Sequence, residues 1–184
     1  MPEAAFALPL PMFASPAKRL VVGIGEFAVS DDPNATIVTH ALGSCVAVCL
    51  WDPLAKVAGL IHVLLPSASI NPVRAKQQPA AFADTGLPIF FQSAYKYGVE
   101  KKRCRVQIVG GADVTGVGAT AIGKRNVLAI KSLLWRNGVL IEREAVGGSS
   151  ARSVSVCVTD GELTITSGGE DVSSQMTRSE PCGR

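Results

Sequence analysis

Short apolar runs separated by turn-forming residues are the main pattern of hydrophobic and polar positions along this 184-residue chain. Runs that are rich in Val, Ile and Leu and bounded by Gly, Pro, Asn or Asp are typical of buried strands. The strands predicted in this way cover residues 19–26, 35–39, 45–51, 56–65, 106–109, 139–144, 154–158 and 162–166. The pair Asp160-Gly161 predicts a hairpin turn into the last of these strands.

Helical periodicity appears in two further stretches. Residues 123–137 place four apolar side chains on one helical face, and Gly138 follows as a terminator. Those side chains are Val127, Ile130, Leu133 and Leu134. A second helix is predicted over 82–97, where Pro88 fits only within a first turn. A majority of strands with two main helices predicts an α/β fold, a sandwich with a largely antiparallel β-sheet.

The two ends of the chain differ from its middle in composition. Residues 1–18 contain several prolines, which interrupt regular structure, and we expect a flexible leader there. Residues 169–184 are polar and predict a disordered tail. The stretch between them, 19–168, predicts one domain, because the chain is 47% hydrophobic and long enough to bury a core. Within it, the polar residues 67–81 predict a loop.

Composition and charge exclude several function classes. A net charge of +3, without a long basic run or an aromatic ladder, argues against nucleic-acid binding. Five cysteines without C-x-x-C spacing and only two histidines argue against a metal site, and no nucleotide-binding motif occurs. No uninterrupted apolar stretch reaches the ~18 residues of a membrane helix. We therefore expect a reduced, cytoplasmic protein that needs no cofactor or metal and does not insert into a membrane.

A predicted hairpin carries the candidate chemistry. Asp52 and Pro53 suit the first two positions of a type I turn, with Pro53 and Leu54 at its centre. Pairing outward from that centre places Cys45 opposite His62. Directly opposed side chains share one face of a sheet, with Cβ atoms ~5 Å apart. The sequence therefore predicts a thiol within reach of an imidazole.

A cysteine beside a histidine can act as a nucleophile with its base. The imidazole of His62 would take the thiol proton of Cys45, and the resulting ion pair would lower the pKa of the thiol. Backbone N–H groups near Gly43 and Ser44 could hold a developing oxyanion, and the Thr39 hydroxyl could orient the base. The residues alone leave a structural alternative open, since a cysteine in an apolar strand is usually inert. A redox thiol protein is a third interpretation, disfavoured because no resolving cysteine lies nearby.

Several short motifs follow one another in one order along most of the chain. They are VVGIGEFAV at 21–29, IVT at 37–39, LGSCVAVCLWDP at 42–53, VAGLIHVLLP at 57–66, FADT at 82–85, VGGA at 109–112, IGKRNV at 122–127 and GGSSARSV at 147–154. In these motifs the chain resembles the chemoreceptor glutamine deamidases of bacterial chemotaxis, the CheD family. A set of motifs in a shared order is far more specific than a single Cys–His pair.

The resemblance implies both a fold and an activity. It implies an α/β sandwich related to toxins that deamidate glutamine, with Cys45 as nucleophile, His62 as base and Thr39 as the third catalytic residue. It implies glutamines on the cytoplasmic helices of chemoreceptors as substrates, and some members also hydrolyse receptor glutamyl methyl esters. A CheC-type chemotaxis phosphatase is the further partner that the resemblance implies.

The chain departs from the family pattern in two loops. His40 and Ala41 stand where the family commonly has Leu and Gly, and loss of that glycine stiffens the loop before the nucleophile. Ser149 and Ser150 stand where Asn and Arg are common, so contacts from that loop are expected to differ. The alternative to an enzyme is an adaptor that binds and regulates a CheC-type phosphatase with little catalysis of its own.

Overall fold

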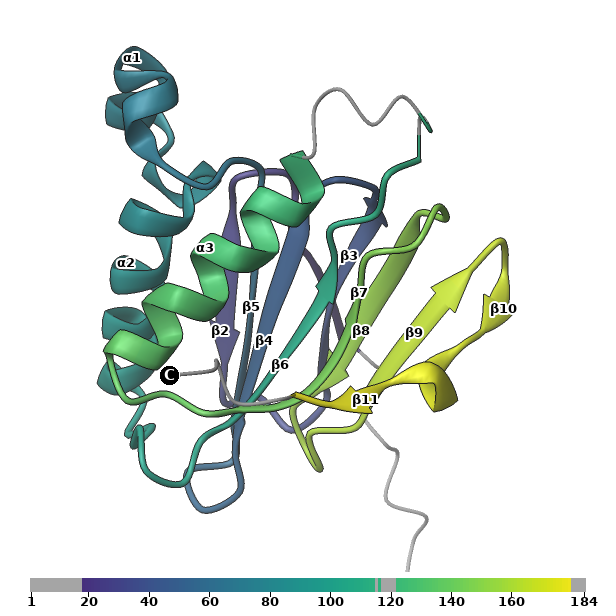
Figure 1. Ribbon diagram of the computed structural model, residues 1–184. Helices are drawn as coiled ribbons and strands as arrows, with labels where there is room; N and C mark the ends of the chain where they lie inside the picture. The colour runs from purple at the N-terminus through teal and green to yellow at the C-terminus, as the bar shows by residue number, and fades with distance from the viewer. Residues whose placement is uncertain (1–17, 115, 117–121, 180–184) are drawn as a thin grey trace, which may run out of the picture.

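Two β-sheets pack face to face, and the two longer helices cover the outer face of one of them (Figure 1). The computed structural model describes residues 18–114, 116 and 122–179. The strands are β1 (Lys18–Val21), β2 (Phe27–Ser30), β3 (Ala35–Leu42), β4 (Val46–Asp52), β5 (Val57–Val63), β6 (Arg105–Gly110), β7 (Ile141–Val146), β8 (Arg152–Cys157), β9 (Leu163–Ser167), β10 (Glu170–Asp171) and β11 (Thr177–Arg178). The helices are α1 (Pro72–Gln77), α2 (Ala83–Lys96) and α3 (Ile122–Arg136), with the 3-10 turns η1 (Ala68–Ile70), η2 (Pro79–Ala81) and η3 (Ser173–Gln175).

Strand order defines the two sheets. The β3 sheet has the order β1-β3-β8-β9-β10, and the β4 sheet has the order β11-β7-β6-β4-β5-β2. The predicted sandwich is confirmed, but the prediction of a largely antiparallel sheet is wrong, because each sheet is mixed. β1 runs parallel to β3, and β6 runs parallel to β7. The second parallel pair follows from α3, which connects β6 to β7. This helix runs back along the sheet, so that β7 begins at the end of the sheet where β6 begins.

Two apolar cores separate the layers. One lies between the β4 sheet and the helices, and it contains Val48, Phe90 and Ile130. The other lies between the two sheets and contains Ile37 and Ile165. β4 is therefore covered on both faces, which explains why its residues form a continuous apolar run instead of an alternating one. Side chains of β4 point alternately to the helices and to the other sheet.

The β4–β5 hairpin forms as predicted, but its register differs from the prediction. His62 pairs with Ala47 and Asp52 pairs with Val57, so Cys45 is not opposite His62. The loop extends to Lys56, whose φ of 55° is left-handed and whose N–H bonds to the Asp52 carbonyl. The pairing therefore shifts by two residues. A shift of two keeps every side chain on its face, so Cys45 and His62 become diagonal neighbours on one face.

Helix predictions agree with the structure to different degrees. The helix predicted over 123–137 is α3, and the helix predicted over 82–97 is α2. Pro88 lies inside α2, beyond its first turn, which contradicts the expected position. A proline there removes one backbone hydrogen bond, and the buried face of α2 compensates for that loss.

Two segments predicted to lack regular structure contain some. Residues 67–81 contain η1, α1 and η2, because Ser67 and Asn71 cap successive turns with their side chains. The predicted tail contains β10, η3 and β11 in its described part, so the prediction of disorder is wrong for residues 170–178. The expected leader, apart from Lys18, and the last residues of the tail, with Cys182, lie outside the described residues.

Candidate active site

A hydrogen bond between the two sheets joins two of the predicted site residues. Thr39 belongs to β3 and His62 belongs to β5, and both side chains are buried. The Oγ1 atom of Thr39 lies 2.7 Å from Nδ1 of His62. The same Oγ1 donates to the backbone oxygen of Val22 at 2.7 Å. The structure thus brings together a threonine and a histidine from different sheets.

These contacts determine which ring nitrogen of His62 carries the proton. A hydroxyl has one hydrogen, and that of Thr39 goes to Val22, whose carbonyl can only accept. The Thr39 oxygen must therefore accept from Nδ1–H of His62. The Nε2 atom is then the unprotonated nitrogen, and it is buried without a hydrogen-bond partner among the described residues. A basic nitrogen with a free lone pair is what a general base requires.

The Cys45 thiol lies on the same side of the β4 sheet. Cys45 directly precedes β4 and belongs to the core between the sheets, with 7% of its surface exposed. Continuing the hairpin register beyond Val46 puts Cys45 diagonal to His62, a spacing of ~7–8 Å between Cα atoms. No hydrogen bond joins the thiol to Nε2 of His62 in this state. A long side chain such as histidine can still span a diagonal pair.

Burial makes both groups neutral. Burial raises the pKa of the Cys45 thiol and lowers the pKa of His62 to about 4. The expected resting thiolate–imidazolium pair is therefore absent, because charging two groups between the sheets without a hydrogen bond is unfavourable. A neutral imidazole remains able to accept the thiol proton when a substrate binds, since catalytic contacts often tighten only in the complex.

The backbone just before and at Cys45 is held through its carbonyl groups. The carbonyl of Gly43 accepts from the N–H of Ala112 at 2.8 Å, and that of Cys45 accepts from Gly111 at 2.7 Å. The Ser44 carbonyl accepts from Nδ2 of Asn126 at 2.9 Å. In a trans peptide the N–H points opposite to the carbonyl. The N–H groups of Ser44 and Cys45 therefore point away from these partners, as an oxyanion site would require.

Ala41, near the end of β3, adopts an unusual backbone conformation. Its φ is 57°, in the left-handed region that favours glycine. The β3–β8 register shifts between Thr39 and Leu42, so β3 carries one extra residue there. Ala41 is the position where the family pattern has glycine, and the left-handed conformation gives the physical reason for that glycine.

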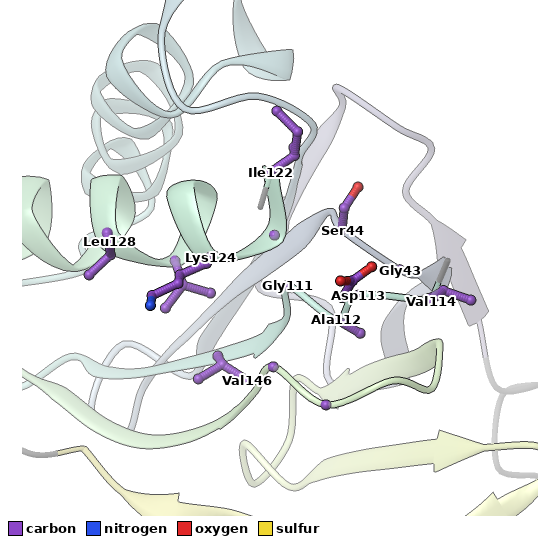
Figure 2. A pocket seen from close by; sticks show the side chains of 14 residues that line it. Gly43, Ser44, Gly111, Ala112, Asp113, Val114, Ile122, Lys124, Leu128 and Val146 are labelled. Carbon is purple, nitrogen blue, oxygen red and sulfur yellow. The ribbon is translucent and has the colours of Figure 1, made fainter. Parts of the chain in front are cut away.

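A pocket borders the same loop from the helix side (Figure 2). Its volume is about 760 Å³, and Gly43, Ser44, Asp113 and Val114 lie at one end of it. Lys124 and Leu128 of α3 line the other end. Cys45 does not line this pocket, because its side chain faces the core between the sheets. The pocket and the Cys45 thiol thus lie on opposite faces of the β4 sheet.

Sequence reasoning missed Asn126, which is fully buried on α3. Its Nδ2 donates to the carbonyls of Ser44 and Leu64, both at 2.9 Å. Asn126 precedes Ile130 by four residues, so it continues the buried helical row that Ile130 and Leu134 occupy. A polar residue in an otherwise apolar row is the signal that could have identified it.

The remaining candidates lie outside this constellation. His40 is exposed on β3, and Cys49 is a core residue whose thiol pKa is raised by burial. No cluster of three or more His, Cys, Asp or Glu side chains suited to a metal occurs in the residues that the structure describes. Within the same residues, no helix is long and apolar enough to cross a membrane.

Comparison with known proteins identifies the family. The family model described as CheD chemotactic sensory transduction matches residues 64–167. The chain is 41% identical over 152 residues to a protein of Anaeromyxobacter dehalogenans named probable chemoreceptor glutamine deamidase CheD 2, covering 82% of this chain and 96% of that protein. It is 39% identical over 156 residues to the chemoreceptor glutamine deamidase CheD of Thermotoga maritima, covering 84% and 96%. A probable chemoreceptor glutamine deamidase, CheD 1 of Syntrophus aciditrophicus, is 38% identical over 151 residues, covering 82% and 94%. The chain therefore belongs to the CheD family.

Proposed function

We propose that this protein deamidates glutamine side chains on the cytoplasmic domains of chemoreceptors. The observation that carries the proposal is the Thr39–His62 hydrogen bond, which leaves Nε2 of His62 unprotonated on the face that carries Cys45. The names of the relatives, chemoreceptor glutamine deamidase, supply the substrate class. Without a neighbouring base to accept its proton, a buried thiol would not become a nucleophilic thiolate.

The reaction runs by acyl transfer. As Sγ of Cys45 bonds to the carboxamide carbon, the thiol proton passes to Nε2 of His62 and the carbonyl electrons move to oxygen. The N–H groups of Ser44 and Cys45 donate to that oxyanion. The imidazolium then protonates the departing nitrogen, so ammonia leaves and a thioester remains.

Hydrolysis of the thioester completes the cycle. Neutral His62 takes a proton from water, whose oxygen attacks the thioester carbon. The carbon–sulfur bond breaks, the imidazolium returns its proton to sulfur, and glutamate is released. The same steps with methanol as leaving group would hydrolyse a glutamyl methyl ester, so methylesterase activity is a second reaction open to this site. Neither reaction requires a metal or a cofactor.

Mass spectrometry of a receptor cytoplasmic domain tests the proposal. Incubation with the protein should raise the mass of a target glutamine by about one dalton, the difference between amide and acid in acyl transfer. The Cys45→Ala protein is the matched control and should leave the mass unchanged. An unchanged receptor mass with both proteins, across several receptors, would rule the deamidase function out.

The raised pKa of Cys45 and the lack of a thiol–imidazole hydrogen bond favour one alternative. We propose as that alternative an adaptor that binds a CheC-type phosphatase and has little catalysis. Binding and deamidation are compatible, so a phosphatase can be a partner of the enzyme as well. Measuring phosphatase binding beside receptor deamidation separates the cases, because the adaptor binds without any mass change.

A further inference from the structure

One side-chain amide connects the nucleophile loop to the strand that carries the base. The side chain of Asn126 is fully buried in the N-terminal half of α3. The start of this helix, at Ile122, adjoins the loop at Ser44 (Figure 2). Its Nδ2 donates to the carbonyls of Ser44 and Leu64. Ser44 directly precedes Cys45, and Leu64 is two residues beyond His62. The two hydrogen bonds therefore join the segments on which the thiol and the imidazole are carried.

The chemistry of the two partners determines how the amide is oriented. Both partners are backbone carbonyls, which only accept, so only the NH₂ group can face them. The Oδ1 atom consequently points elsewhere, and it is buried without a hydrogen-bond partner among the described residues. An acceptor left unpaired in the interior is unfavourable. The Asn126 amide thus leaves its acceptor unpaired while its NH₂ group donates to both carbonyls.

The bond to Ser44 has a consequence for the nucleophile. The Ser44 carbonyl and the Cys45 N–H belong to one peptide plane and point in opposite directions. Holding the oxygen in place therefore also sets the direction of the Cys45 N–H. In the proposed acyl transfer that N–H is a donor to the oxyanion, which forms only in the transition state and in the intermediate.

We infer that Asn126 is a positioning residue for the deamidation reaction: it orients the Ser44–Cys45 peptide so that the Cys45 N–H stabilises the oxyanion, and it holds that peptide at a set distance from the His62 strand. The inference rests on the proposed function. Gly123 supports the same arrangement, because a Cβ there would lie 2.4 Å from the oxygen of Gly111, whose N–H bonds to the Cys45 carbonyl, and would force α3 away from that segment.

The experiment compares the wild type with Asn126→Asp and Asn126→Ala. Asn126→Asp keeps the volume and replaces the NH₂ group by an oxygen that can donate at most one hydrogen bond, whereas Asn126→Ala removes the amide altogether. Asn137→Asp is the matched control, since Asn137 is an exposed amide just after α3. Each protein is assayed for ammonia release from a recombinant receptor cytoplasmic domain, for alkylation of Cys45 by iodoacetamide and for thermal unfolding.

Loss of an oriented oxyanion donor should lower kcat by about 10²-fold in both Asn126 variants. KM should stay within about threefold, because the oxyanion does not exist in the bound substrate. Alkylation of Cys45 forms no oxyanion, so its rate should also stay within about threefold of wild type. The control should resemble the wild type in all three measurements.

Three outcomes would overturn the inference. One is an unchanged kcat, and another is a fall of kcat and alkylation together, which would indicate general damage to the site. Failure of both variants to fold would assign Asn126 to the fold alone. A wild-type protein without deamidase activity is a separate result, since it rejects the proposed function itself and with it this role.

Discussion

Buried polar groups near the two ends of the β4–β5 hairpin differ in how completely they are hydrogen-bonded. At the turn, the carboxylate of Asp52 is fully buried and saturated with donors. Those donors are the N–H groups of Leu54, Ala55 and Glu100 and Nε of Arg103. At the other end, Nε2 of His62 and, on the adjoining helix α3, Oδ1 of Asn126 are buried with no partner among the described residues.

The contrast indicates which end is structural and which is functional. A buried group whose bonds are all made holds the chain in place and has no capacity left for a ligand. A buried group with a free position keeps that capacity, at a cost in stability of about 1–3 kcal/mol. We therefore expect substitutions near His62 to change activity and those at Asp52 to change stability.

The largest expected effect is that of Cys45→Ala. Deamidation should fall to background, because no other group at the site can form the thioester. The free energy of unfolding should fall by only about 1 kcal/mol, since the substitution removes one buried sulfur. Receptor binding should persist. Cys49→Ala is the matched control on the same face of β4 and should keep its activity, whereas wild-type deamidation by Cys45→Ala would refute the nucleophile assignment.

A smaller loss is expected for Thr39→Val, which keeps the volume and removes the hydroxyl. Nδ1–H of His62 would lose its acceptor, and the tautomer with a basic Nε2 would no longer be favoured. Loss of such an orienting partner lowers activity about 10–100-fold. Thr39→Ser restores the hydroxyl and should recover most of kcat. Equal activity of the Val and Ser variants would contradict the orienting role.

The pH dependence should reveal the buried imidazole. Burial lowers the pKa of His62 from its ordinary value of 6.5 to about 4, so the neutral base persists far into the acidic range. The acid limb of kcat/KM should therefore have its midpoint nearer 4 than 6.5. The stability that neutral His62 contributes is fully present above its ordinary pKa and is lost as the pH falls toward 4. Circular dichroism at each pH separates this loss from catalysis, and a limb near 6.5 would contradict burial of the base.

Asp52→Asn should act on stability instead of activity. Burial alone would raise the pKa of Asp52, but hydrogen bonds from Arg103 and three backbone groups hold it below its ordinary value. Its stabilising contribution is then present above the ordinary pKa and is lost as the pH falls through the folded value. We expect Asp52→Asn to lower the free energy of unfolding by about 2 kcal/mol at neutral pH and by much less at strongly acidic pH. Denaturant unfolding at both pH values measures this, and a loss that is the same at both would contradict the role of the charge.

The smallest expected effect is that of Ala41→Gly. Ala41, near the end of β3, and Lys56, in the β4–β5 turn, are left-handed non-glycine residues, with φ of 57° and 55°. Glycine relieves about 1 kcal/mol of strain, which its extra chain entropy partly offsets, so a net gain of about 0.5 kcal/mol is expected at Ala41. Lys56→Gly should gain less, because the Lys56 ammonium lies 5.3 Å from the centre of the Trp51 ring and that contact is lost. Thermal unfolding compares the two variants, and a larger gain in stability for Lys56→Gly would contradict the prediction.

The parts of this fold that the sequence predicts are those governed by local patterns. Helical periodicity predicted α3 over 123–137, within one residue of Ile122–Arg136 at each end. The run around Cys45 predicted a buried strand, and alternation predicted that Cys45 and His62 share a face. The prediction of a shared face remained correct although the predicted register was wrong by two residues, because side chains alternate with a period of two.

Tertiary structure decided what lies across that face. The left-handed Lys56 lengthened the turn, and no local pattern distinguished this loop from a shorter one. The fit between two sheets brought the Thr39 hydroxyl onto His62, and the packing of α3 brought Asn126 onto Ser44. Sequence by itself determined which residue types were available on each face of each element. Only long-range packing, which depends on every layer at once, decided which buried polar atoms found partners and which, such as Nε2 of His62, did not.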